Sequence, residues 1–210
     1  MTNFSFPYFS TSISEFWQRW HISLSSWFRD YVYIPLGGNR VSNARRRFNV
    51  ITTFLLSGLW HGANWTFVLW GGIHGLGVMI SKRVLSIKKT FVSRAIACLY
   101  TMMFVVVGWI FFRANTVSDL WILITKLVKV QKSQIGWYLY GDYKWELILS
   151  FSLIVALFLV EYLMQKTRCQ DPFSLARNRT LRFVFYSIAL YVIFLLGVFH
   201  SSSEFIYFQF

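Results

Sequence analysis

Residues 48–80 read FNVITTFLLSGLWHGANWTFVLWGGIHGLGVMI, a stretch without a single Lys, Arg, Asp or Glu. One straight helix of this length would be about 50 Å long, well over the roughly 30 Å hydrocarbon core of a bilayer. Two full spans with a turn would need roughly 40 residues or more. Glycines interrupt the stretch at positions 58, 62, 71 and 72. The sequence therefore predicts a re-entrant or broken-helix hairpin over 48–80, buried in protein or lining a wet cavity.

The composition of the whole chain agrees with a membrane protein. Of 210 residues, 56% are hydrophobic and 20% aromatic, and only 14% are charged. A soluble domain carries about a quarter charged residues, so it could not cover this apolar surface. Three ordinary spans are expected at about 92–112, 146–165 and 183–200. The predicted fold class is all-α: a polytopic, multi-pass helical bundle that forms one domain over 1–210.

The excess of positive charge, 21 Lys and Arg against 8 Asp and Glu, has two possible meanings. One is a nucleic-acid partner; the other is the cytoplasmic enrichment of Lys and Arg beside membrane spans. The basic residues cluster just outside the apolar stretches, at 40–47, 82–94 and 166–182. This placement favours the membrane and no nucleic acid. It puts both ends of the hairpin and 166–182 in the cytoplasm, and 113–145 outside.

Residues 12–34 have the spacing of one amphipathic helix at the membrane interface. Ser12 and Glu15 fit a capping box at its start. Aromatic and leucine residues then recur at three- and four-residue spacing, ending before Pro35: Phe16, Trp20, Leu24, Trp27 and Tyr31. Charged residues within this range make it a poor spanning segment. A second, short amphipathic helix is expected around residues 120–128.

The histidines are the candidates for chemistry. His61 lies within the uncharged hairpin, where an ionisable side chain is expensive and by default functional. A neutral imidazole there suits a general base, and the alternative is a histidine that is hydrogen-bonded to a neighbouring helix. His21 and His74, judged alone, are more often packing histidines.

Other kinds of site find little support. No metal is expected, because His61 and His74 are 13 residues apart with no acid between them. The sequence contains no G-x-S-x-G elbow and no P-loop. Ser57 precedes His61 by four residues but has no acid nearby. The tryptophans around the hairpin are typical of packing and of interfacial belts, and collectively of a water-poor tunnel wall.

Two long motifs, FWQRWHISLSSWFRDYVYIPLGGNR (16–40) and SGLWHGANWTFVLWGGIHG (57–75), resemble the membrane-bound O-acyltransferase family, and its alginate O-acetyltransferase branch in particular. The C-terminal SSSEFIYFQF is similar to that branch too. The resemblance implies that His61 is the catalytic base and that His21 is the second active-site residue. We assign a further set to the substrate tunnel: Trp20, Trp60, Asn64, Trp65, Arg29 and Asp30.

The resemblance also implies a reaction and its setting. An acyl group, expected to be acetyl, would pass from a cytoplasmic thioester such as acetyl-CoA to a polysaccharide hydroxyl outside the bacterial inner membrane. Alginate is one such acceptor, and a partner protein, either an extracytoplasmic acetyltransferase or a polysaccharide-assembly protein, is another. No tightly bound cofactor is expected. Family members have further N-terminal spans, so this chain corresponds to the C-terminal catalytic portion. The alternatives are D-alanyl transfer to teichoic acid by the same fold, and an inactive truncated or structural subunit.

Overall fold

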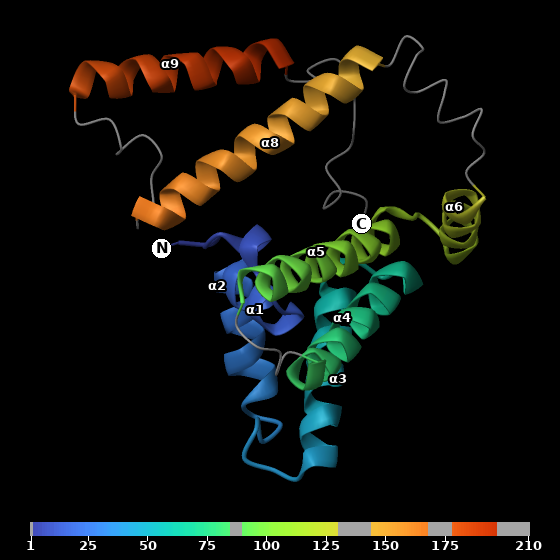
Figure 1. Cartoon of the computed structure of the whole chain (residues 1–210). Helices are drawn as coiled ribbons and strands as arrows, with labels where there is room; N and C mark the ends of the chain where they lie inside the picture. Colours follow the sequence, from blue (N-terminus) through green and yellow to red (C-terminus); the bar gives the residue numbers. More distant parts are fainter. Residues whose placement is uncertain (1, 85–89, 130–143, 168–177, 197–210) are drawn as a thin grey trace. The chain divides into compact units, whose positions relative to one another are not determined.

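The computed structural model describes residues 2–84, 90–129, 144–167 and 178–196. Within these ranges every regular element is a helix, which confirms the predicted all-α class (Figure 1). The chain forms two compact units, residues 1–132 and 133–210, where the sequence predicts one domain. The three histidines in the described ranges all belong to the first unit.

The segment predicted as one amphipathic helix over 12–34 is broken. After the short 3-10 turn η1 (Pro7–Phe9), it consists of α1 (Ile13–Arg19), α2 (Ile22–Phe28) and the π-helical turn η2 (Arg29–Tyr33). Ser12 caps α1 by accepting a 3.1 Å hydrogen bond from the Glu15 amide. The helix stops at Trp20 and restarts after His21, whose backbone is left-handed with φ 45° and ψ 55°.

The uncharged stretch forms a hairpin of two helices, α3 (Asn43–His61) and α4 (Trp65–Val84), joined by residues 62–64. The predicted helical hairpin is therefore present, and both of its helices extend beyond the predicted bounds of 48–80. Gly62 ends α3 with φ 157° and ψ 156°, a backbone conformation that is essentially confined to glycine. Asn64 starts α4, because its Oδ1 accepts a 3.1 Å hydrogen bond from the Thr66 amide.

Glycines bring α3 and α4 into close contact. A Cβ added to Gly58 would overlap the Phe67 carbonyl of α4, and a Cβ added to Gly71 would overlap the Phe54 carbonyl of α3. Gly58 thus faces Phe67, whereas the earlier Phe54 faces the later Gly71, so the two helices run antiparallel. Small residues at such positions let backbones approach, which drives helix association where no hydrophobic effect acts.

The other elements of the first unit are α5 (Phe91–Arg113) and α6 (Val117–Val128). α5 packs on α4 and α1, and α6 contacts both α4 and α5 (Figure 1). α5 is long and apolar enough to cross a membrane, in agreement with the span predicted at 92–112. α6 confirms the short helix expected around 120–128 and begins with a capping box between Thr116 and Asp119.

The second unit contains α8 (Lys144–Thr167) and α9 (Arg179–Leu196). α8 is also long and apolar enough to span a membrane, and its apolar side chains are largely exposed. Lipid-facing side chains need no protein partner, so this exposure fits a membrane helix. The last four residues of the span predicted at 183–200 lie outside the described residues.

Candidate active site

His61 is buried at the point where three helices meet. It is the last residue of α3, and its side chain is 7% exposed. Its ring lies edge-to-face against Trp70 of α4 at 5.2 Å and against Phe112 of α5 at 5.1 Å between centroids. The neighbouring Trp60 ring is 4.9 Å away. The imidazole is thus held in an aromatic cage at the tip of the hairpin.

His21 lies at the break between α1 and α2. A left-handed backbone is uncommon for a residue with a Cβ, and such strain tends to occur at functional positions. The N-terminal segment holds the break in place, because Asn3 accepts hydrogen bonds of 3.0 Å from the amides of Ile22 and Ser23. The His21 Nδ1 is buried and has no hydrogen-bond partner among the described residues.

The fold brings His21 and His61 together although 40 residues separate them in the sequence. Trp20, the residue before His21, lies 6.2 Å from Trp109 of α5, and Phe112, about one turn further along α5, contacts the His61 ring. Both rings also lie beside aromatic side chains, with Phe4 at 6.3 Å from His21. A pair of imidazoles in an apolar cage can exchange a proton with a bound hydroxyl and stabilise a developing negative charge.

A cavity of about 390 Å³ lies between α2 and α3. Its wall includes Ile22, the residue after His21, but neither His21 nor His61 itself. Its wall is mostly apolar, with hydroxyl groups from both helices. Ser57 belongs to this wall and lies one helical turn before His61 on α3. Trp17 and Arg29 contribute from α1 and η2. No local sequence pattern indicates this cavity, because its lining comes from helices that are separate in the chain.

A second cavity, of about 420 Å³, adjoins the first at Tyr33, Val50 and Val78. Arg46 and Arg47, in the first turns of α3, line it. From the sequence the basic cluster at 40–47 indicates topology alone, and the structure adds that two of its arginines border a cavity.

Arg29 and Asp30, assigned to the tunnel, form an ion pair with each other. The Arg29 Nε lies 2.7 Å from the Asp30 Oδ1, and both side chains are about half exposed or more. The hydrogen bond from Arg29 lowers the pKa of the Asp30 carboxyl, so that side chain stays ionised near neutral pH. Arg29 reaches the first cavity, whereas Asp30 is not among the residues of its wall.

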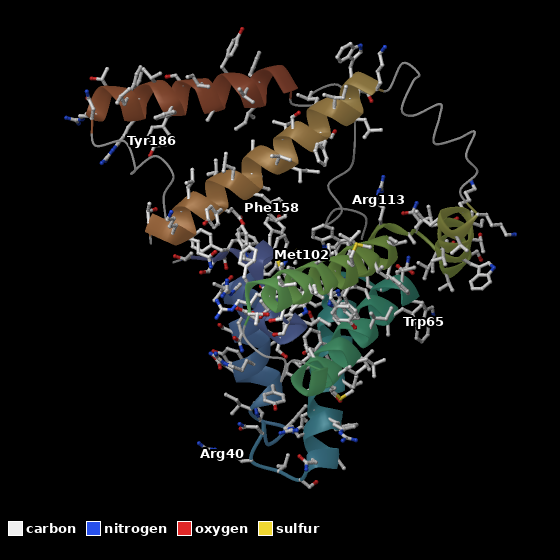
Figure 2. All side chains as sticks on the ribbon, viewed as in Figure 1. Arg40, Trp65, Met102, Arg113, Phe158 and Tyr186 are labelled. Atoms are coloured by element: carbon white, nitrogen blue, oxygen red, sulfur yellow. The ribbon has the colours of Figure 1, made fainter. Side chains whose placement is uncertain are left out.

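The other four assigned tunnel residues lie outside the lining of both cavities. Trp20 packs in the aromatic core of the first unit, stacked on Phe16 at 5.6 Å. Asn64 caps α4 and donates a hydrogen bond to the Asn115 carbonyl. Trp65 is 72% exposed and points outward from the start of α4 (Figure 2). Trp60 is half exposed, and its ring contacts His61 at 4.9 Å and Phe28, a residue of the first cavity wall, at 6.5 Å.

His74 is a packing residue in part, as its sequence context predicts, but it also makes a specific polar contact. Its side chain is 1% exposed, and its Nδ1 accepts a 3.3 Å hydrogen bond from the Trp17 indole. The Trp70 ring lies between the two buried histidines, 5.0 Å from His74 and 5.2 Å from His61.

Comparison with known proteins supports the resemblance noted from the motifs. The sequence model of the membrane-bound O-acyltransferase family matches residues 3–118, more than half of the chain. This range includes His21, His61 and the linings of both cavities.

Three relatives illustrate the range of similarity. A probable alginate O-acetylase of Azotobacter vinelandii is 50% identical over 123 residues, 58% of this chain and 24% of that protein. A peptidoglycan O-acetyltransferase of Helicobacter pylori is 39% identical over 137 residues, 64% of this chain and 25% of that protein. A teichoic acid D-alanyltransferase of Streptococcus thermophilus is 42% identical over 95 residues, 42% of this chain and 23% of that protein. The matched part therefore spans about a quarter of the length of these relatives.

Proposed function

Because the chain belongs to the membrane-bound O-acyltransferase family, we propose that it carries the catalytic histidines of an enzyme that transfers an acetyl group from a cytoplasmic thioester to a polysaccharide hydroxyl outside the inner membrane. The observation that carries the proposal is His61. It is a buried imidazole, caged by aromatic rings and one helical turn from a residue of a cavity wall.

The reaction follows from this arrangement. His61 takes the proton of the acceptor hydroxyl while the hydroxyl oxygen attacks the thioester carbonyl carbon. The carbon–sulfur bond then breaks, and the departing thiolate takes up the proton from the imidazolium. His21 orients the reacting groups and stabilises the negative charge on the carbonyl oxygen. The aromatic cage keeps out water, which would otherwise hydrolyse the thioester.

The two adjoining cavities support a donor with a long arm and a phosphate-bearing end. Arg46 and Arg47 are suited to bind phosphate groups, such as those of CoA, near the cytoplasmic end of α3. From Arg46 to His61 the helix rises about 22 Å. The acyl end would therefore reach His61 through the first cavity, most of the way across a hydrocarbon core of about 30 Å. This depth favours an acceptor on the outer side.

Arg46→Gln and Arg47→Gln are expected to raise the KM for acetyl-CoA by about tenfold or more each, because a charge-assisted hydrogen bond contributes roughly 1.5–3 kcal/mol. The kcat should change little, and the effect should shrink at high salt. Arg45→Gln is the matched control, since Arg45 lies over the Phe48 ring and does not line the cavity. The KM for acetyl-CoA is obtained from initial rates of the natural protein in proteoliposomes. Equal KM values in all three variants would refute the phosphate site.

His21→Gly tests the role of the imidazole separately from that of the left-handed backbone at this position. Glycine relieves about 1 kcal/mol of left-handed strain, so the folded protein should be no less stable than wild type. Acetyl transfer should nevertheless fall by about 10- to 100-fold, the effect of losing one strong hydrogen bond to the reacting group. Thermal unfolding and initial rates are measured on the same preparation. If the glycine variant transfers acetyl groups at the wild-type rate, His21 has no role in the reaction.

The identity of the acyl group rests on the relatives. Acetyl is favoured because the alginate-type relative is 50% identical over 123 residues, whereas the D-alanyltransferase is 42% identical over 95 residues. A D-alanyl thioester on a carrier protein is the alternative donor. In the deciding experiment, membranes that contain the natural protein receive one of two radiolabelled donors. One donor is acetyl-CoA, and the other is the D-alanyl carrier. Labelled polysaccharide from acetyl-CoA alone is expected. Label from the D-alanyl carrier alone would reverse the assignment, and no label from either donor would favour an inactive subunit.

A further inference from the structure

We propose that His74 is a positioning residue of the acyl-transfer site, which holds Trp17 at the cavity wall and, with Trp70, sets the place of His61. The effect on acyl-transfer kinetics rests on the proposed function. The inference is built on one hydrogen bond, three ring contacts and one close approach, all within the first unit.

The hydrogen bond between Trp17 and His74 fixes the state of the imidazole. An indole N–H can only donate, so the Nδ1 of His74, 3.3 Å from the Trp17 Nε1, must be the unprotonated acceptor. The ring proton of the neutral imidazole is then on Nε2. Because Trp17 also lines the 390 Å³ cavity, one end of this bond is buried and the other end shapes a binding surface.

The opposite side of the His74 ring is closed by α5. A Cβ added to Gly108 would collide with the His74 Nε2, so glycine is the residue that leaves room for the ring. The Nε2 is buried and has no hydrogen-bond partner in the described part of the chain. Burying the Nε2–H without a hydrogen-bond acceptor costs free energy. A leucine or phenylalanine would fill the same space and would bury no polar group. Packing alone therefore does not explain a histidine here, whereas the need to hold Trp17 does.

Trp70 connects the hydrogen-bonded pair of Trp17 and His74, which we call the anchor, to His61. It precedes His74 by one turn of α4 and is 5% exposed. Its ring lies 5.6 Å from the Trp17 ring and between the two histidines. Movement of Trp17 or His74 would thus be passed directly to the cage around His61, since buried side chains have little free space to absorb it.

The test compares four variants. His74→Asn keeps an acceptor, because the asparagine Oδ1 can take the place of the imidazole Nδ1. His74→Leu removes the acceptor, and Trp17→Phe removes the donor but keeps a ring. The fourth variant combines Trp17→Phe with His74→Leu.

The first measurement is independent of acyl transfer. Ser57→Cys, in a background with Cys98→Ser and Cys169→Ser, reports access to the cavity through its rate of reaction with a small methanethiosulfonate. Losing one hydrogen bond should favour local opening by roughly tenfold, so His74→Leu and Trp17→Phe should speed the reaction by about that factor. His74→Asn should stay within about threefold of the wild type.

The second measurement is the kinetics of the natural protein with acetyl-CoA. His74→Leu and Trp17→Phe should each lower kcat/KM by about tenfold, and the double variant should be no worse than either, because both remove the same bond. His74→Asn should recover most of the loss.

The proposal fails if His74→Asn is as impaired as His74→Leu in both measurements, or if the two single effects add in the double variant. It also fails if the cavity reacts equally fast in all variants. If the thiol reaction changes as expected while no variant, nor the wild type, transfers acetyl groups, the anchor stands and the proposed function is wrong.

Discussion

His61→Ala is expected to lower kcat for acetyl transfer by about 10²- to 10⁴-fold, the usual contribution of a positioned general base. The KM for acetyl-CoA should change little, because His61 is absent from the lining of both cavities. His61→Gln should be nearly as inactive, since an amide can hydrogen-bond to the hydroxyl but cannot take its proton. Initial rates with labelled acetyl-CoA and the natural protein measure both variants.

The fold must be shown to survive in these variants. His61 packs against Trp70 and Phe112, so a smaller side chain leaves a void that could disturb the cage. Glutamine fills more of that space than alanine and serves as the packing control. Transfer at the wild-type rate by His61→Gln would exclude His61 as the base, whatever its effect on stability.

The second large effect concerns two adjacent glycines in α4. Gly71→Ala should destabilise the protein by about 2–3 kcal/mol, because its Cβ would overlap the Phe54 carbonyl and push the two helices of the hairpin apart. In a domain of this size such a loss lowers the melting temperature by roughly 5–10 °C. Thermal unfolding in detergent is the measurement.

Gly72→Ala is the matched control. Its Cβ would meet the Leu55 side chain at 3.6 Å, an ordinary van der Waals contact. Alanine also favours a helix over glycine by up to about 1 kcal/mol. The melting temperature should therefore stay the same or rise. Equal behaviour of the two variants would mean that the helices do not approach as closely at Gly71 as the structure has them.

The hairpin could be predicted because its signal is local. The absence of charge, the length and the glycines all lie within residues 48–80, and each restricts the fold directly. The structure adds what the glycines are for: Gly62 ends α3, and Gly58 and Gly71 bring the helices together. How deeply the hairpin enters a membrane remains a prediction.

The break at His21 could not be predicted, because the apolar stripe continues through it at helical spacing. The interruption depends on Asn3, whose backbone and side chain hold the start of α2. That contact joins residues about 20 positions apart and leaves no periodic signal. The resemblance to the family named His21 as a site residue, whereas its place on a helix face suggested packing.

The cavities were missed for a similar reason. Their lining residues indicate other things in the sequence: Ser57 stands there only as a possible nucleophile, and Arg46 and Arg47 only as markers of topology. Ser57 lines a cavity between α2 and α3, and Arg46 and Arg47 line one that η2 and α4 complete. No single stretch of sequence specifies these neighbours. Of the six residues assigned to the tunnel, Arg29 reaches a cavity, whereas Asn64 and Trp20 have structural contacts that explain them.

The most direct test is an electron cryo-microscopy structure of the natural protein with a non-hydrolysable acetyl-CoA analogue. The phosphates should lie at Arg46 and Arg47, and the arm should follow the cavity past Ser57. The acyl carbonyl should sit beside His61, within the roughly 3–3.5 Å of a reactive geometry for the incoming hydroxyl. An analogue bound elsewhere, with the His61 ring sealed off from it by packed side chains, would contradict the account.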